Sequence, residues 1–172
     1  METIVLGGGC FWCVEAVFSN LKGVKSIKPG YSGGNISNPT YREVCSGRTG
    51  HAEIVIIEYS PKTIELNVLL AVFFATHDPT TLNRQGGDIG TQYRSVIFTS
   101  DDAQAEIAKR AIELANDDYS DDIVTTVEPL GEVFIAEDYH HNYFAENKET
   151  PYCNAVIAPK IANLKKKFSG LI

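Results

Sequence analysis

The sequence predicts a single α/β domain in which short strands and helices alternate along the chain. Two observations support this prediction. Apolar runs of strand length alternate with segments whose apolar residues recur at helical spacing. The chain has 172 residues, enough for one domain with a substantial core, and shows no internal repeat, low-complexity segment or linker. We therefore expect a single domain that spans residues 1–172.

The first half of the chain predicts three strands and two helices. The strands are short and rich in apolar residues, and they cover residues 3–8, 24–31 and 52–59. The helices cover residues 11–22 and 64–75. The first helix has Phe11, Val14 and Phe18 on one face and is expected to end at Gly23. The second is apolar nearly all round, which is typical of a buried helix.

The second half begins with residues 76–91, a long irregular stretch of the kind that often carries function in a compact domain. The strands expected after it cover residues 93–98, 124–127 and 132–135. Ser100 is expected to cap a helix. The inward-facing residues of that helix are expected to be Ala103, Ile107, Ala111 and Leu114. A helix over 136–147 and a last helix that opens at Pro159 complete the chain.

Composition and charge exclude several function classes. The net charge is −7, and the basic residues form no long cluster except residues 165–167, so no nucleic-acid partner is expected. The N-terminus lacks the pattern of a signal peptide, and no apolar run reaches the ~18 residues of a membrane span. We expect a soluble, cytoplasmic protein that does not bind membranes. Its four cysteines should then be catalytic, metal-binding or buried thiols instead of disulfides.

Cys10 is the best candidate for a nucleophile. Three glycines at positions 7–9 turn the chain from the first predicted strand into the first helix, which places Cys10 at the helix N-terminus. Free backbone N–H groups and the positive end of the helix dipole favour a thiolate at this point. The thiolate is the reactive form of cysteine, so the position predicts reactivity. Phe11 and Trp12 follow directly and predict an apolar floor beside the thiol.

Cys10 and Cys13 have the Cys-x-x-Cys spacing of a redox pair. Two buried thiols at a helix start, or two ligands of a zinc site, remain alternatives. A cysteine phosphatase would need an arginine where the chain has Ala16, and no Gly-Lys-Ser/Thr follows the glycines, so nucleotide binding is unsupported. Thioredoxin-type dithiol exchange remains open, and it would require no acid.

Glu53 provides a candidate acid. On the predicted strand it shares a face with Val55 and Ile57, and a carboxyl group on an apolar face has a raised pKa. A protonated glutamic acid near a thiolate can act as a general acid. The alternative is a solvated glutamate at a strand edge.

Tyr41 and Tyr93 each lie next to a predicted turn, where a phenol could donate a hydrogen bond to a polarised oxygen. Taken singly, each is more often a core residue with a solvated hydroxyl. The pair His77-Asp78 is better explained by loop stabilisation than by catalysis. His140 and His141 lie among aromatic residues and are interpreted as packing or surface residues.

Taken together, these segments resemble the methionine sulfoxide reductase A family over nearly the whole chain. The matching stretches occur in order, which makes the resemblance specific. They are Gly9-Cys10-Phe11-Trp12, Gly30-Tyr31-Ser32-Gly33-Gly34, Tyr41 to Cys45, Ser46 to Glu53, His77-Asp78-Pro79-Thr80, Asn83-Arg84-Gln85-Gly86, Asp88 to Ser95 and Ala136-Glu137-Asp138-Tyr139-His140.

The resemblance implies a reaction that uses this residue set. The Cys10 thiolate attacks the sulfoxide sulfur while Glu53, which matches the family's acid, protonates the oxygen. The other matching positions imply substrate-binding roles: Tyr41 and Tyr93 for phenols that polarise the oxygen, Asp88 for a carboxylate that orders the site through water, and Phe11 and Trp12 for aromatic walls around the methyl group. The products are methionine and a sulfenic acid on Cys10.

A second thiol must then form a disulfide, which the resemblance implies is reduced by thioredoxin, or by dithiothreitol in vitro. Here the chain departs from the commonest family pattern. Cys13 stands where the family usually has glycine, and a further helix replaces the glycine-rich tail. Cys153 matches the family's resolving position, whereas Cys13 has the shorter loop to close. Both remain candidates, and Cys45 matches a cysteine without a catalytic role and is expected to be buried.

The family's fold is an α/β sandwich with a ferredoxin-like core, and its members act on the S epimer of free and peptide-bound methionine sulfoxide. The resemblance also implies a monomer with no bound cofactor or metal. A general dithiol oxidoreductase that uses Cys10 and Cys13 remains the alternative, and a zinc-binding interaction module is a third hypothesis.

Overall fold

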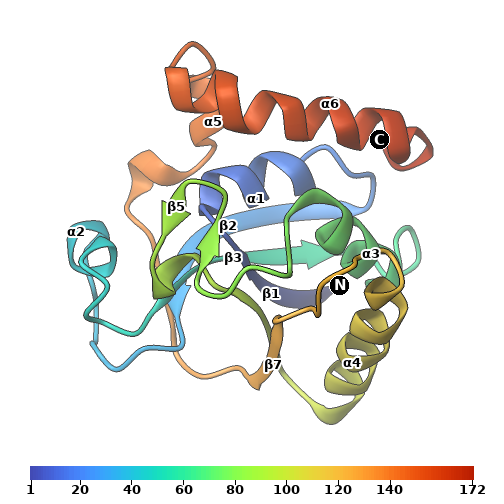
Figure 1. Cartoon of the computed structure of the whole chain (residues 1–172), viewed down its shortest axis with the longest axis horizontal. Helices are drawn as coiled ribbons and strands as arrows, with labels where there is room; N and C mark the ends of the chain where they lie inside the picture. The colour runs from blue at the N-terminus through green and yellow to red at the C-terminus, as the bar shows by residue number, and fades with distance from the viewer.

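The computed structural model describes all 172 residues as one mixed sheet with helices packed on one face (Figure 1). The sheet has six strands in the order β7-β6-β1-β3-β2-β8. Their bounds are β1 Glu2–Gly8, β2 Val24–Ser32, β3 Ala52–Tyr59, β6 Ser95–Thr99, β7 Thr126–Pro129 and β8 Val133–Ile135. All neighbours are antiparallel except β6 and β7. The four central strands, β6-β1-β3-β2, have the order of a ferredoxin-like core, as the family resemblance implied.

The helices are α1 Phe11–Phe18, α2 Tyr41–Cys45, α3 Leu66–Thr76, α4 Asp102–Asn116, α5 Tyr143–Glu146 and α6 Ala158–Lys167. In Figure 1, α1 lies between the sheet and α6, which crosses the top of the molecule. The larger core cluster lies on this helix-covered face and includes Ile4, Leu6, Val55 and Ile57 from the strands. A smaller cluster on the opposite face centres on Val5, Ile54 and Phe98.

The positions of most predicted elements are confirmed, and their ends differ by a few residues. The strand predicted over 52–59 is β3. The first helix ends at Phe18, before Gly23, whose backbone has φ +94°. Residues 76–91 contain a two-stranded hairpin, β4 Arg84–Gln85 and β5 Asp88–Ile89. Tyr93 lies in a short 3-10 turn before β6, so the prediction that it belongs to the strand was wrong.

For α4 the predicted cap was wrong, and of the four residues predicted to face inward only Ala111 is buried. The N-cap is Asp101, whose carboxylate accepts from the backbone N–H of Gln104 at 2.8 Å. The buried side chains are Ala108, Ala111 and Ala115. Ile107 and Leu114 are 39% and 59% exposed, because the small alanines allow close packing and the larger side chains are left facing outward.

The continuous helix predicted over 136–147 is also absent. This segment forms a 3-10 turn at Asp138–His140 and the short helix α5. Asn142 between them has φ +57°, a left-handed conformation that interrupts a helix. The chain then passes through a π-helical turn, Cys153–Ile157, into α6.

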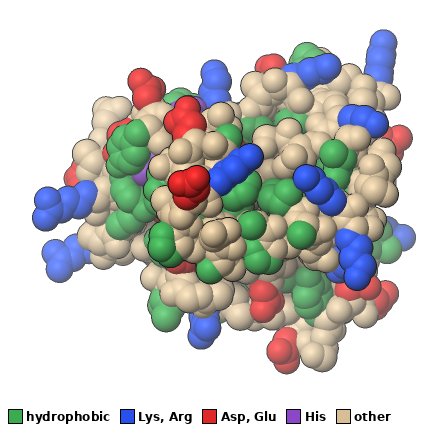
Figure 2. Space-filling model, turned by 90° about the horizontal axis from the view of Figure 1, so that it is seen from above, with side chains coloured by type: hydrophobic (Ala, Val, Ile, Leu, Met, Phe, Trp, Pro, Cys, Tyr) green, Lys and Arg blue, Asp and Glu red, His purple; other side chains and the backbone are tan.

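The charged surface is mixed. On the face in Figure 2, lysine and arginine side chains are dispersed among acidic and hydrophobic ones. No helix combines the length and the apolar character that crossing a bilayer requires.

Candidate active site

Cys10 lies at the junction of β1 and α1, where the glycine run turns the chain. It is the N-cap residue of α1, with φ −61° and ψ 129°, as the sequence predicted. Gly9 has φ +95°, and a Cβ at this position would lie 2.7 Å from the Gln85 side chain. Glycine is therefore required for the backbone to place Cys10 at the helix start while the hairpin β4-β5 packs over it.

The two cysteines of the Cys-x-x-Cys pair are both buried and interact with each other. Cys10 is 5% exposed and Cys13 is 3% exposed. Burial raises the pKa of Cys10 well above its usual value, with further increases from Cys13 and the charge of Glu53. The pKa of Cys13 is lowered to about 7, chiefly by its hydrogen bond with Cys10 and also by Lys160 and Tyr152. The helix terminus was predicted to favour a thiolate at Cys10, and the backbone N–H of Trp12 acts in that direction, but burial acts against it and raises the pKa of the thiol.

Glu53 lies on β3 beneath the start of α1 and is 1% exposed. The backbone N–H of Phe11 donates to its Oε1 at 3.0 Å, and its Oε2 is buried without a partner. The pKa of Glu53 is raised to about 8, chiefly by burial and in part by the charge of Asp88. The hydrogen bond from the Phe11 N–H opposes this shift. The buried carboxyl group that the sequence predicted is therefore protonated at neutral pH.

Tyr41 and Tyr93 approach the same region from two different segments. Tyr41 opens α2, a short helix held by a capping box between Thr40 and Glu43. Burial raises the pKa of both tyrosines, with the charge of Glu53 as the next cause, so both phenols remain proton donors. Both hydroxyls also interact with the thiol of Cys45, which is exposed, so the prediction that Cys45 is buried was wrong. Cys45 ends α2, and this short helix lies at the surface.

Aromatic rings gather around Phe11 and Trp12. Phe11 is fully buried and stacks on Tyr41 with ring centroids 6.1 Å apart. Trp12 stacks on Tyr143, with centroids 3.8 Å apart and an interplanar angle of 8°. The indole N–H of Trp12 donates to Nδ1 of His140 at 3.0 Å. These contacts fix the orientation of the indole ring.

Asp88 is half-buried on β5 and is bound directly by a tyrosine that the sequence analysis missed. The hydroxyl of Tyr152 donates to Oδ2 of Asp88 at 2.7 Å. The same hydroxyl lies 3.5 Å from Sγ of Cys13. Asp88 is thus connected to the cysteine pair through Tyr152, whereas the resemblance suggested a connection through water.

Cys153, the other candidate resolving thiol, follows Tyr152 in the chain. It is fully buried at the start of the π-helical turn, which packs against α1. Its backbone N–H donates to Oγ1 of Thr150 at 3.3 Å. Cys10, Cys13 and Cys153 all belong to the larger buried core cluster. All four cysteines are free thiols.

Four further site residues were missed as functional candidates: Glu137, His140, Tyr143 and Tyr152. Glu137 accepts from the Tyr31 hydroxyl at 2.8 Å and from the Tyr41 backbone N–H at 2.9 Å, and so anchors α2. Glu137 was assigned no role from the sequence, and His140 was interpreted as a packing or surface residue; its ring is fully buried among aromatic rings, which confirms the packing interpretation. A buried indole requires an acceptor, which is the signal that could have identified His140.

His77 lies behind the cysteine pair and is buried. Its Nδ1 contacts the carbonyl oxygen of Phe73, and its Nε2 lies 2.9 Å from Oγ of Ser95. Ser95 in turn lies 2.6 Å from Oγ1 of Thr125. Every polar atom of the ring is engaged, which agrees with the stabilising role favoured by the sequence.

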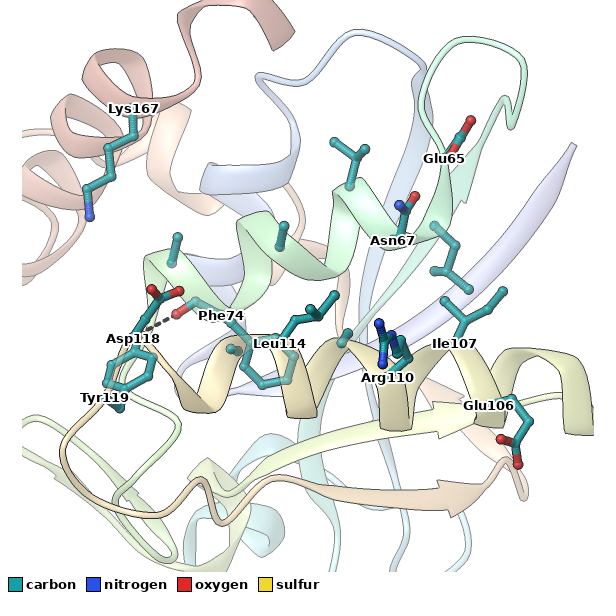
Figure 3. A pocket seen from close by; sticks show the side chains of 16 residues that line it. Glu65, Asn67, Phe74, Glu106, Ile107, Arg110, Leu114, Asp118, Tyr119 and Lys167 are labelled. Carbon is teal, nitrogen blue, oxygen red and sulfur yellow. Dashed lines mark hydrogen bonds between the residues drawn. The ribbon is translucent and has the colours of Figure 1, made fainter.

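A large pocket lies away from the cysteine pair. It has a volume of about 1300 Å³ and runs between α3 and α4 (Figure 3). Its lining includes Ile107, Leu114 and Phe74, with Arg110 and Lys167 at its edge, and contains no cysteine. No three His, Cys, Asp or Glu side chains are grouped as metal ligands, which does not favour the zinc alternative.

Comparison with known proteins relates the whole chain to one family. The family model described as peptide methionine sulfoxide reductase matches residues 2–171. A peptide methionine sulfoxide reductase MsrA from Chromobacterium violaceum is 53% identical over 100% of this chain and 99% of its own length. One from Polynucleobacter asymbioticus is 52% identical over 100% of this chain and 92% of its own length.

Solved structures give the same result. Reduced Mxr1 from Saccharomyces cerevisiae superposes with a TM-score of 0.84 at 36% identity and 88% coverage of both chains. Methionine sulfoxide reductase A of Corynebacterium diphtheriae has a TM-score of 0.83 at 39% identity, covering 88% of this chain and 78% of its own. Mxr1 has also been solved in complex with Trx2, with a TM-score of 0.60 at 25% identity, covering 83% of this chain and 84% of that one.

Proposed function

Because this chain belongs to the peptide methionine sulfoxide reductase family and is an oxidoreductase that reduces methionine sulfoxide, we propose that Cys10 is its nucleophile and Glu53 its general acid. The carrying observation is the carboxyl group of Glu53. It is held against the N-terminus of α1 by the Phe11 N–H, remains protonated at neutral pH, and has one oxygen, Oε2, with no partner.

The first step converts the sulfoxide to methionine. The Cys10 thiol transfers its proton to the sulfur of Cys13, the hydrogen-bonded partner whose pKa is lowered to about 7. The Cys10 sulfur attacks the sulfoxide sulfur and forms an S–S bond, while Glu53 protonates the oxygen and the S–O bond of the substrate breaks. The hydroxide released then attacks the Cys10 sulfur, the S–S bond breaks, and the products are a sulfenic acid on Cys10 and methionine. Glu53 then takes up a proton from solvent.

Substrate binding is assigned to the groups around the pair. Tyr41 and Tyr93 donate hydrogen bonds to the sulfoxide oxygen, because burial keeps both phenols protonated. Phe11 and Trp12 form the apolar wall for the methyl group, and Asp88 orders the site together with Tyr152. Tyr143 and His140 support the Trp12 ring.

Cys13 is proposed as the first resolving thiol. It is hydrogen-bonded with Cys10 and lies one helical turn from it, within reach of the sulfenic acid. The step is balanced, because the sulfenic acid and the Cys13 thiol yield a Cys10–Cys13 disulfide and one water. Cys153 is the alternative, since its segment packs against α1 and Tyr152 beside it touches Cys13.

Thioredoxin is proposed as the reductant that restores both thiols, because the Saccharomyces cerevisiae relative forms a complex with Trx2. Dithiothreitol should replace it in vitro. We further propose a cytoplasmic monomer without a bound cofactor that acts on the S epimer of free and protein-bound methionine sulfoxide. Oxidised proteins are thus the proposed substrates for repair.

The test follows both epimers of a methionine sulfoxide peptide with thioredoxin as reductant. Wild type should turn over the S epimer only, and Cys10→Ser should be inactive. Cys13→Ser should form one methionine per enzyme and then stall, whereas Cys153→Ser should continue. A stall in Cys153→Ser alone would assign resolution to Cys153, and near-normal turnover by Cys10→Ser would overturn the proposal. Insulin disulfide reduction without sulfoxide turnover would support the dithiol oxidoreductase alternative.

A further inference from the structure

A chain of two hydrogen bonds connects Cys13 to a carboxylate near the surface. The Tyr152 hydroxyl lies 3.5 Å from Sγ of Cys13 and donates to Oδ2 of Asp88 at 2.7 Å. While the phenol donates its single proton to Asp88, its oxygen accepts from the Cys13 thiol whenever Cys13 is protonated. The chain therefore has a direction, from the Cys13 thiol through Tyr152 to Asp88.

Solvent exposure increases along this series of hydrogen-bonded residues, from Cys13 to Tyr152 and Asp88. Cys13 is 3% exposed, whereas Tyr152 and Asp88 are half-buried. A proton that reaches Asp88 can exchange with solvent, while a proton on Cys13 has no direct contact with water. The three residues come from α1, the segment before the π-helical turn, and β5, so only the folded chain brings them together.

Several titratable groups face Cys13 from the elements around it, namely Cys10, Glu53, His77, Asp88, Tyr152 and Lys160. Glu53 and His77 are neutral at neutral pH, because their pKa values are about 8 and about 4. Lys160 on α6 lines the same small cavity as Cys13 and is the cation of the group. It favours a thiolate at Cys13 but cannot accept a proton, which leaves Asp88 as the anionic acceptor connected to the thiol.

The second chemical step creates the need for such an acceptor. During the first step Cys13 takes the proton of Cys10, so it is a thiol when the sulfenic acid appears. The hydrogen bond from the Cys10 thiol, the largest cause of the lowered pKa of Cys13, is lost once Cys10 is oxidised. Tyr152 is then the remaining hydrogen-bonded side chain through which the Cys13 proton can leave.

We propose that Tyr152 relays the proton of Cys13 to Asp88, and so activates Cys13 as the resolving nucleophile. The inference rests on the proposed function, in which Cys13 resolves the sulfenic acid of Cys10. Cys13 loses its proton to Oη of Tyr152 as the Tyr152 proton passes to Oδ2 of Asp88. The Cys13 sulfur forms the S–S bond, the S–O bond of Cys10 breaks, and the hydroxide takes a proton from Glu53 and leaves as water. Tyr152 is left donating to the sulfur side of the chain.

The test measures the two steps separately in a single turnover of the full chain. Methionine formation reports the first step, and loss of free thiol reports disulfide formation. Tyr152→Phe should slow disulfide formation about 100-fold more than methionine formation, a typical loss for a proton-transfer group. Its apparent pKa for disulfide formation should rise toward that of an ordinary cysteine. Asp88→Asn should show the same shift in the second step.

Tyr119→Phe is the matched control. Tyr119 is also a half-buried tyrosine with a hydrogen-bonded hydroxyl, but it donates to the carbonyl oxygen of Phe74 and lies outside the site. Its pH profile for disulfide formation should match wild type. A purely structural role of Tyr152 would change rates without moving the profile. Solvent deuterium should also reveal two transferred protons in wild type and one in Tyr152→Phe.

The outcomes separate the relay from the function on which it rests. Without a methionine burst in wild type, the proposed nucleophile and acid fail. If Cys13→Ser still forms the first disulfide at the wild-type rate, Cys13 is not the resolving thiol. If both of those hold and Tyr152→Phe keeps the wild-type pH profile for disulfide formation, the relay alone is overturned.

Discussion

Two buried titratable side chains on either side of Cys10 and Cys13 have opposite hydrogen-bonding states. Glu53 has one oxygen bonded and the other unpaired. His77 has both ring nitrogens engaged, one by the carbonyl of Phe73 and one by the hydroxyl of Ser95. The pKa of Glu53 is raised to about 8 and that of His77 is lowered to about 4, in both cases chiefly by desolvation.

The difference shows how burial serves two purposes in one small domain. Both groups are held neutral at neutral pH, but only Glu53 has an atom and a proton available for a substrate. His77 is part of a closed chain that runs through Ser95 to Thr125 and ties α3 to β6. An unpaired buried atom costs stability, which agrees with the general-acid role proposed for Glu53.

The largest expected effect is on the first chemical step. Glu53→Gln keeps the shape and the Phe11 hydrogen bond but cannot donate an acid proton. We expect methionine formation at pH 7 to slow by about 100-fold to 1000-fold, with the loss smallest at acidic pH where solvent supplies the proton. Single-turnover rates between pH 5 and 9 measure this. A pH-independent loss would contradict the general-acid role.

Glu53→Gln, which should lower activity, should raise the stability of the folded protein at alkaline pH. The folded state keeps a proton on Glu53 up to a pKa of about 8, whereas the unfolded chain loses it near 4.5, so wild-type stability falls as the pH rises between these values. Glutamine does not ionise, so the stability of Glu53→Gln should not fall over this pH range. It should be more stable than wild type at pH 9 by up to about 4 kcal/mol, measured by urea unfolding. Equal slopes with pH in both proteins would contradict the raised pKa.

His77 should show the reverse dependence. Its pKa of about 4 lies below the 6.5 of an ordinary histidine, so the unfolded chain binds a proton that the folded state excludes. Stability is retained above pH 6.5 and is lost as the pH falls from 6.5 to about 4. His77→Leu should remove this dependence and cost about 2 kcal/mol at pH 7, because Ser95 and the Phe73 carbonyl lose their partner. The single-turnover rate of the folded fraction should stay near that of wild type, and a large rate loss would place His77 in the catalytic site.

The smallest expected effect is at His140, which combines the two bonding states compared above: one ring nitrogen is hydrogen-bonded and the other is unpaired. It is fully buried, and its Nδ1 accepts from Trp12 while its Nε2 is unpaired. His140→Phe removes the acceptor of the indole N–H. We expect KM for a sulfoxide peptide to rise about fivefold with little change in kcat, equivalent to one neutral hydrogen bond. A decrease in kcat alone would indicate that His140 acts in the chemistry.

Much of this architecture could be predicted because it depends on neighbours in the chain. The strand, the glycine turn and the helix around Cys10 follow from local spacing, and the burial of Glu53 follows from alternation with Val55 and Ile57 on β3. The helix predicted over 136–147 does not form, because Asn142 has a left-handed backbone conformation that interrupts it. The buried face of α4 failed because packing selected alanines over larger side chains.

The sequence by itself determined where the reactive cysteine and the acid lie on their own elements, since backbone geometry sets the side-chain direction along one strand or one helix turn. Only the tertiary structure decided how far that cysteine is buried, and this burial raises its pKa. It also decided which side chains surround the pair. Tyr152 meets Cys13 across 139 positions, a contact that depends on how the C-terminal segment packs over α1.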